Sequence, residues 1–129
     1  MLMIADIDYF KRVNDKFGHQ IVDEVLVTCA KRLKKHLGSD DLIARWGSEE
    51  FLILLRDKSN NSLDVLKNRA QQLQQIIGKN EMQLSTENIT ITITAGVSEH
   101  DGSPFDICLR NADQKLYQGK NSGRNRLIM

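Results

Sequence analysis

The chain has 129 residues, the size of one domain that buries roughly two-thirds of its unfolded surface. Its formal net charge of +1 and its aromatic content of 5% argue against a nucleic-acid partner, because neither an electrostatic footprint nor a base-stacking platform is evident. No apolar run approaches the ~20 residues that would cross a bilayer, and no signal peptide precedes the first apolar run. The isolated Cys29 and Cys108 lack metal-ligand spacing and are predicted to be buried free thiols. We therefore expect a soluble domain from a reducing compartment.

The first third of the chain is predicted to form a strand and two helices. The apolar run over residues 2–7 is short enough for a buried strand. Apolar positions then recur three and four apart, which predicts helices over residues 9–17 and 22–37. Gly18 breaks the first of these helices, and Gly38 lies where a C-cap glycine of the second belongs.

A β-hairpin is predicted next, over residues 42–46 and 51–55. A glycine-started two-residue connection, Gly47-Ser48, joins the two apolar runs. Two adjacent carboxylates, Glu49 and Glu50, follow this turn.

A second pair of acids, Asp6 and Asp8, follows the first predicted strand. The ends of two strands can bring such acids together from positions that are distant in sequence. Clusters of oxygen ligands suit Mg²⁺, which favours carboxylates plus substrate phosphates over a complete protein cage. The two acid pairs therefore predict a magnesium site.

The remainder is predicted to contain a loop, a helix, a second hairpin, a last helix and a final strand. The loop spans residues 57–61, the helix 63–77 and the second hairpin 82–86 with 89–97. The last helix spans residues 103–120, and the final strand spans 126–129. Asn61 or Ser62 can cap the first of these helices and Gly78 ends it, while Pro104 occupies the first turn of the last helix. Strict alternation over residues 89–97 is a strong strand signal. Hairpins covered by helices indicate an α+β fold whose sheet is mostly antiparallel.

Four motifs together resemble the GGDEF domain, the catalytic domain of bacterial diguanylate cyclases. They lie, in order, at residues 6–26, 45–55, 94–98 and 112–126, and they read DIDYFKRVNDKFGHQIVDEVL, RWGSEEFLILL, TAGVS and ADQKLYQGKNSGRNR. The resemblance covers nearly the whole chain at compatible spacing, so it is highly specific. It implies a palm-like, ferredoxin-related α+β fold with a central, mostly antiparallel sheet surrounded by helices. It also implies that residues 1–129 are one GGDEF domain of a larger signalling protein, without the family's usual segment before the first strand.

The resemblance implies an activity as well. Two domains, each holding one GTP, would face each other in a homodimer and condense the nucleotides into cyclic di-GMP with release of pyrophosphate. Two Mg²⁺ or Mn²⁺ ions per active site would neutralise charge, and positioning would supply most of the remaining catalysis. We expect a cytoplasmic location, either in a soluble protein or in the cytoplasmic part of a membrane-anchored one. A sensory or receiver domain would control the activity.

Residue by residue, the resemblance assigns the acids to the metals. Asp6, the backbone carbonyl of Ile7 and Glu49 would bind the ions, and Glu50 would lie beside them. One of the two glutamates would also accept the proton of the attacking 3′-hydroxyl.

The nucleotide contacts come from four other places in the chain. Asn14 and Asp23 match the family's guanine readers. The implied role is chemically reasonable, because a carboxylate can accept from the N–H donors of guanine and an amide can hydrogen-bond to its O6 and N3. Lys120 and Arg124 match the triphosphate clamp, a point charge plus a planar fork. Backbone N–H groups of residues 10–11, Phe10 and Lys11, would assist at the start of a helix.

Three positions depart from the family pattern. Ser48 stands where the signature has a glycine that lies against the nucleotide, and Val22 replaces the glycine before Asp23. In the family's product-inhibition motif, RxxD, Asp41 keeps the aspartate but Gly38 occupies the position of the arginine. The inhibitory site is therefore not intact, because the bidentate grip of arginine is missing.

Two alternatives to an active cyclase remain open at this point. One is a degenerate domain with weakened catalysis that binds GTP or cyclic di-GMP as a receptor, and Ser48 is its main support. The other is a dimerisation module that has lost nucleotide contact. The retained acids, guanine readers and phosphate clamp count against the second alternative.

Overall fold

The computed structural model describes residues 1–56 and 63–129 of the chain. In these residues the elements are β1 (Leu2–Ile7), α1 (Phe10–Phe17), α2 (His19–Lys35), β2 (Leu42–Arg45), β3 (Glu50–Leu54), α3 (Leu63–Lys79), β4 (Met82–Gln83), β5 (Asn88–Ile89), β6 (Ile93–Ser98), α4 (Phe105–Asn121) and β7 (Leu127–Ile128). The predicted loop over residues 57–61 and the predicted caps Asn61 and Ser62 lie outside the described residues.

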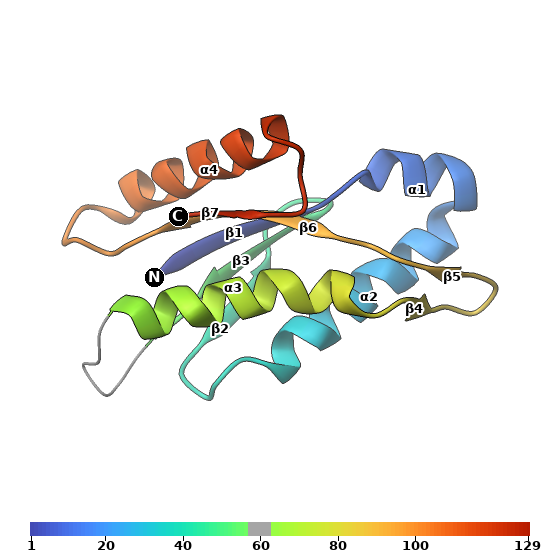
Figure 1. Ribbon diagram of the computed structural model, residues 1–129, viewed down its shortest axis with the longest axis horizontal. Helices are drawn as coiled ribbons and strands as arrows, with labels where there is room; N and C mark the ends of the chain where they lie inside the picture. Colours follow the sequence, from blue (N-terminus) through green and yellow to red (C-terminus); the bar gives the residue numbers. More distant parts are fainter. Residues whose placement is uncertain (57–62) are drawn as a thin grey trace.

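A five-stranded sheet in the order β2-β3-β1-β6-β7 organises the fold. Its first three pairings are antiparallel, and only β7 runs parallel to its neighbour β6. Helix α4 lies on one side of the sheet, and α2 and α3 lie on the other (Figure 1). The expected α+β class with a mostly antiparallel sheet is therefore confirmed.

Strand β1 is the centre of this arrangement, because it pairs with β3 on one edge and with β6 on the other. All six of its residues are buried. Met3, Ala5 and Ile7 pack into the core beneath α2 and α3, while Leu2 and Ile4 pack against α4. A strand covered on both faces needs a continuous apolar run rather than an alternating one, as residues 2–5 have.

The predicted strand over residues 89–97 is wrong as a single element. The run is divided between β5, which pairs with β4 in a separate two-stranded sheet, and β6, which belongs to the central sheet. Residues 90–92 lie in neither strand. All six residues of β6 are buried, so the alternation in sequence does not continue as alternating burial, and it does not indicate which partner each half takes.

Three helix ends also differ from prediction. Helix α2 begins at His19, directly after Gly18 with its φ of 87°, and ends at Lys35 with His36 as its C-cap, so the predicted C-cap at Gly38 is wrong. Helix α3 continues through Gly78 to Lys79. A Cβ at Gly78 would lie 3.0 Å from the side chain of Thr92, so this glycine permits close packing rather than ending the helix.

The predictions on the two cysteines and on membrane-spanning segments can be compared with the structure. Cys29 and Cys108 are both free and buried, as predicted, and burial raises the pKa of the Cys29 thiol to about 12. Among the described residues, no helix has the length and apolar character that a membrane span requires.

The closest packing between the sheet and α4 occurs at Gly96 on β6. A Cβ at this position would overlap the backbone of Ala112, Lys115 and Leu116, so the helix lies directly on the strand. A second close contact between α4 and β6 occurs at Gly119 of α4, where a Cβ would lie 2.7 Å from the side chain of Thr94. These two glycines therefore set the height of α4, and with it the height of Lys120, above the sheet.

We predict that Gly96→Ala lowers the free energy of unfolding by about 3 kcal/mol or more, because the added methyl group meets backbone that cannot rotate away. Urea denaturation followed by far-UV circular dichroism measures the change. Gln114→Ala, at an exposed position of α4, is the control and should stay within about 0.5 kcal/mol of the parent. Equal stability of the Gly96 variant and the parent would show that α4 does not lie this close to β6.

Candidate active site

The acids at the ends of β1 and β3 come together, as the two acid pairs suggested for Asp6 with Glu49 and Glu50. Asp6 is the register partner of Glu50 across the two antiparallel strands, so their side chains share a face of the sheet. One residue further, the backbone N–H of Ile7 donates to the carbonyl of Glu49 at 3.1 Å. Pairing of the strands thus fixes the spacing of the acids.

A cavity of about 520 Å³ lies at this end of the sheet. Its lining consists of Asp6, Ile7, Asp8, Tyr9, Phe10, Lys11, Arg12, Asp15, Glu49, Lys120 and Arg124. It combines carboxylates with four cationic side chains and the start of a helix. Such a site suits a ligand that carries both a multiply charged anion and metal ions.

Lys120 from α4 enters the cavity and forms an ion pair with Asp6, whose side chain is 4% exposed. Burial raises the pKa of Asp6 to about 6, although the hydrogen bond and the charge of Lys120 oppose the rise. The charges of Glu49 and Glu50 push the pKa of Asp6 further upward. Burial likewise raises the pKa of Glu50, again against the effect of Lys120. The acids are therefore held close together at a cost in electrostatic energy that a bound cation would offset.

The N-terminus of α1 borders the same cavity. Tyr9, the residue before the helix, has a φ of 56° and makes no side-chain cap, and the first turn carries no acidic residue. The first N–H groups of a helix have no partner within the helix, and with the helix dipole they favour an anion. Phe10 and Lys11, the predicted phosphate-binding residues of this turn, both line the cavity.

Arg124 reaches the cavity from the turn after α4. Its guanidinium lies 4.9 Å from the centre of the Tyr9 ring, and Arg12 lies 4.4 Å from the same ring. The structure therefore brings the two predicted clamp residues, Lys120 and Arg124, and the start of α1 to one cavity.

Asp8 has a different role from the one its sequence position suggested. It is 4% exposed, and both of its carboxylate oxygens accept hydrogen bonds from the protein, from Thr92, Thr94 and the backbone of Asn125. Asp8 lines the same cavity as Asp6, but three protein donors bind its carboxylate, and a metal role for it stays a prediction. Strand β1 ends at Ile7 and the chain turns at Tyr9, so the two-residue alternation no longer applies at Asp8.

The predicted guanine readers lie outside the lining of this cavity. Asn14 is half-buried on α1, and Asp23 is exposed on α2. Asp23 lines a neighbouring groove of about 340 Å³ together with residues of the β4–β5 region, Gln83 and Leu84. Helices α1 and α2 pack against each other, but neither residue contributes to the lining of this cavity.

The donor set fits a divalent ion that is completed by its substrate. Over residues 1–56 and 63–129, no three His, Cys, Asp or Glu side chains are placed to hold a metal ion by themselves. The cavity does present the carboxylates of Asp6 and Glu49. Mg²⁺ is usually bound by one or two carboxylates together with waters and substrate phosphates, so this pair is a sufficient protein contribution.

Comparison with known proteins agrees with the motifs. The family model described as diguanylate cyclase, GGDEF domain, matches residues 1–126. The chain belongs to the GGDEF domain family.

Relatives of this GGDEF domain include a probable diguanylate cyclase, DgcT, of Escherichia coli, which is 36% identical over 99% of this chain and 28% of its own length. The solved active GGEEF domain of a diguanylate cyclase from Vibrio cholerae is 34% identical with a TM-score of 0.83, over 98% of this chain and 80% of that one. The GGDEF domain of DgcB from Caulobacter crescentus, solved in complex with c-di-GMP, is 27% identical with a TM-score of 0.87, over 98% and 75%. The chain thus spans less than a third of the curated relative.

The signature hairpin of this GGDEF domain differs from the predicted two-residue turn. Four residues, 46–49, connect β2 to β3, and the N–H of Trp46 closes the turn on the carbonyl of Glu50 at 2.8 Å. The guanidinium of Arg45 donates to the carbonyls of Gly47 at 3.2 Å and Ser48 at 2.8 Å. The side chain of Arg45 thus stabilises the turn. The prediction of a two-residue turn from the position of the glycine does not consider such a contact.

Ser48, the variant position of the signature, contacts a predicted metal ligand directly. Its hydroxyl donates to the carboxylate of Glu49. At the neighbouring Gly47, a Cβ would lie 3.1 Å from a carboxylate oxygen of Glu50, so a side chain here would require the Glu50 side chain to shift by a few tenths of an ångström. The serine hydroxyl therefore uses part of the acceptor capacity of the Glu49 carboxylate.

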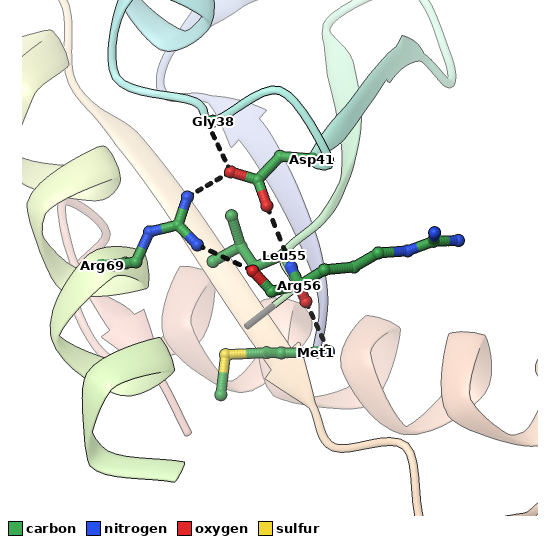
Figure 2. A network of polar contacts seen from close by, with 6 residues as sticks. All are labelled: Met1, Gly38, Asp41, Leu55, Arg56 and Arg69. Carbon is green, nitrogen blue, oxygen red and sulfur yellow. Dashed lines mark hydrogen bonds and ion pairs between the residues drawn. The ribbon is translucent and has the colours of Figure 1, made fainter. Parts of the chain in front are cut away.

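The loop that carries the incomplete inhibitory motif lies at the opposite end of the sheet. Asp41 accepts from the N–H groups of Gly38 at 2.7 Å and Arg56 at 2.9 Å, and it forms an ion pair with Arg69 of α3 (Figure 2). The Asp41 side chain is 1% exposed. Its burial would raise its pKa, but the hydrogen bond from Arg69 and those from the backbone outweigh burial and lower the pKa.

We predict that Asp6→Asn stabilises the metal-free protein at neutral pH. Because the pKa of Asp6 is raised, the folded state favours the protonated carboxyl group. Its contribution to the free energy of unfolding is full below about pH 3.8 and is lost as the pH rises through about 6. The variant should therefore gain about 1–3 kcal/mol at pH 7.5, and the gain should vanish near pH 4.

Urea denaturation from pH 4 to pH 8 in the presence of EDTA measures this difference. Asp41→Asn is the matched control with the opposite sign, because the lowered pKa of Asp41 stabilises the fold above its ordinary titration range. Destabilisation by Asp6→Asn at every pH would contradict the claim that the ionised Asp6 carboxylate costs electrostatic energy in the folded state.

Proposed function

We propose that this GGDEF domain is a diguanylate cyclase, which condenses two GTP molecules into cyclic di-GMP and releases two pyrophosphates. The observation that carries the proposal is the single cavity that contains Asp6, Glu49, Lys120, Arg124 and the start of α1. Acids for metal ions and cations for a triphosphate are the two requirements of phosphoryl transfer, and both occur at one end of β1.

The chain's own residues bind and orient the triphosphate. The ammonium of Lys120 and the guanidinium of Arg124 neutralise phosphate oxygens, and the backbone N–H groups of Phe10 and Lys11 donate to others. Such positioning, rather than covalent chemistry, supplies most of the catalysis in this class of reaction.

The carboxylates of Asp6 and Glu49 and the carbonyl of Ile7 would hold Mg²⁺ or Mn²⁺, with Glu50 beside them. Divalent ions bound there supply charge neutralisation at the α-phosphate. The 3′-oxygen of one GTP forms a bond to the α-phosphorus of the other as the bond to pyrophosphate breaks. Glu49 or Glu50 accepts the 3′-hydroxyl proton, and the raised pKa of Glu50 moves this group closer to the working pH of a base.

Guanine would be read by Asn14 of α1 and Asp23 of α2, outside the lining of this cavity. The carboxylate of Asp23 accepts from the N–H donors of guanine, and adenine lacks that donor pair. The reaction needs two facing domains, so the active form is a homodimer. A further sensory or receiver domain in the full protein is supported by the length of the curated relative, of which this chain matches 28%. The enzyme is expected in the cytoplasm.

A second function, a receptor for GTP or cyclic di-GMP with weakened catalysis, is favoured by one observation. The hydroxyl of Ser48 is hydrogen-bonded to Glu49 and competes with metal ions for that carboxylate. Such competition weakens turnover before it weakens binding, because reaction geometry tolerates less displacement than affinity does.

Product inhibition through the loop that contains Asp41 should be absent. Gly38 supplies no guanidinium, and the carboxylate of Asp41 is already occupied by Arg69 and two backbone N–H groups. Cyclic di-GMP would therefore compete for the active half-site rather than bind tightly at this loop.

We predict that the protein forms cyclic di-GMP from GTP in the presence of Mg²⁺. The rate per chain should rise with protein concentration until all chains are dimeric. ATP should give no cyclic product. Liquid chromatography of the nucleotides measures the reaction. Glu49→Ala should abolish turnover, and Asp23→Ala should weaken GTP binding by about 1–3 kcal/mol. A wild-type protein that binds GTP and ATP equally, or a Glu49 variant with full turnover, would contradict these assignments.

Ser48→Gly should raise the rate of cyclic di-GMP synthesis at equal dimer concentration, by up to about 10²-fold. Ser48→Ala separates the two physical causes, since it removes the hydroxyl but keeps the Cβ. If the hydrogen bond to Glu49 limits the rate, both variants become faster, whereas crowding by the Cβ predicts a gain for glycine alone. An already brisk rate that neither variant changes would leave the receptor function without support.

A further inference from the structure

Asp8 is a buried carboxylate to which the reaction assigns no role. Its Oδ1 accepts the hydroxyl of Thr94 at 2.5 Å, and its Oδ2 accepts the hydroxyl of Thr92 at 2.7 Å and the backbone N–H of Asn125 at 2.9 Å. In return the backbone N–H of Asp8 donates to the carbonyl of Thr92 at 2.9 Å. This one side chain therefore ties the end of β1 to β6 and to the turn after α4.

The turn that Asp8 holds has an uncommon backbone. Arg124 and Asn125 have φ values of 62° and 46°, in the left-handed region that side chains other than glycine rarely adopt. Such residues persist only where the surroundings impose the conformation. Here the N–H of Arg124 donates to the carbonyl of Gly119 at 3.1 Å, and Gln74 donates to the side chain of Asn125 at 3.0 Å. The side chain of Arg126 also donates to the carbonyl of Arg124 at 3.0 Å, and the N–H of Asn125 is held by Asp8.

The residue on the other side of Asp8 contacts the same arginine. Tyr9 also has a left-handed φ, of 56°, and its ring lies 4.9 Å from the guanidinium carbon of Arg124. A guanidinium over an aromatic face at this distance is attracted to it. Asp8 therefore fixes the backbone beside Arg124, while its chain neighbour Tyr9 contacts the side chain.

We infer that Asp8 is a positioning residue that acts through Arg124. Its carboxylate holds the turn, and Tyr9 holds the guanidinium, so that Arg124 faces the start of α1 across the cavity before any nucleotide arrives. This inference rests on the proposed function for its ligand, a nucleoside triphosphate, because it assigns the position of one phosphate-binding side chain. Prior ordering of a binding group raises affinity by removing the cost of fixing it on binding.

A purely structural role for Asp8 predicts a different result. A buried carboxylate that satisfies three donors contributes to stability wherever it occurs, and its loss would then lower stability without affecting Arg124 in particular. The two roles differ in whether the effect of Asp8 on nucleotide binding requires Arg124.

The test is a double-mutant cycle with Asp8→Asn and Arg124→Ala, in which GTP binding is measured by calorimetry with Mg²⁺. Groups that orient a ligand contact typically matter by about 10–100-fold, so Asp8→Asn should weaken GTP binding by about tenfold. In the Arg124→Ala background the same substitution should have no further effect, because the group through which Asp8 acts is gone. Binding of GMP, which lacks the outer phosphates, should change much less.

Asp41→Asn is the matched control. It makes the same substitution at a buried carboxylate that also accepts three hydrogen bonds, but it lies at the opposite end of the sheet. It should lower stability and leave GTP affinity unchanged. If Asp8→Asn does not fold, Tyr9→Leu replaces it, because Tyr9 is 46% exposed and its ring contact with Arg124 is worth about threefold in affinity.

A ligand-free measurement separates this inference from the proposed function. The Nε–H resonance of Arg124, assigned from its absence in Arg124→Ala, should be displaced by the Tyr9 ring in the wild type and should move in both Asp8→Asn and Tyr9→Leu. If the wild type binds no GTP, the proposed function fails and this resonance alone decides whether Asp8 orders Arg124. Normal GTP affinity in a folded Asp8→Asn protein, an equal loss in the Arg124→Ala background, or an unmoved resonance overturns the inference.

Discussion

The burial of β1 on both faces and both edges is the constraint on which the rest of the structure depends. A strand in that position can carry no charge along most of its length, so its polar residues occur only where it ends. At that end Asp6 pairs with Glu50, and Ile7 hydrogen-bonds to Glu49. The spacing of the acids is therefore a property of strand pairing, which is rigid, rather than of a loop. A site built in this way keeps its geometry without a ligand.

Two aspartates that lie only two residues apart, Asp6 and Asp8, solve the problem of a buried carboxylate differently. Asp8 accepts three hydrogen bonds from the protein, so most of its acceptor capacity is used within the fold. Asp6 has one cationic partner, Lys120, and a raised pKa, so it remains available to other cations. The first arrangement fixes the backbone, and the second is the one expected of a ligand-binding carboxylate. The close contact of α4 with Gly96 and Gly119 matters here, because it carries Lys120 to the height of Asp6.

Much of this could be predicted from the sequence. The apolar run of β1, the helical periodicities and the four motifs were sufficient for the fold class and for the acids, lysine and arginine of the cavity. The division of residues 89–97 could not be predicted, because alternation reports a buried face and not a partner. The four-residue signature turn depends on Arg45, whose side chain binds two carbonyls, and the role of Asp8 depends on Asn125, 117 residues away. Contacts of this kind join residues whose types are individually unremarkable in sequence.

Stability and binding are concentrated at opposite ends of the same strands. At one end, Asp41 has a lowered pKa and stabilises the fold at every pH above its ordinary titration range. At the other, near the opposite end of β1, Asp6 has a raised pKa and costs stability at neutral pH. Anything that binds the folded acids as a cation therefore recovers that cost and stabilises the native state by mass action. The site is thus maintained by interactions that lie elsewhere, as at Asp41, and a ligand that carries its own divalent ions gains affinity from the repulsion that it relieves.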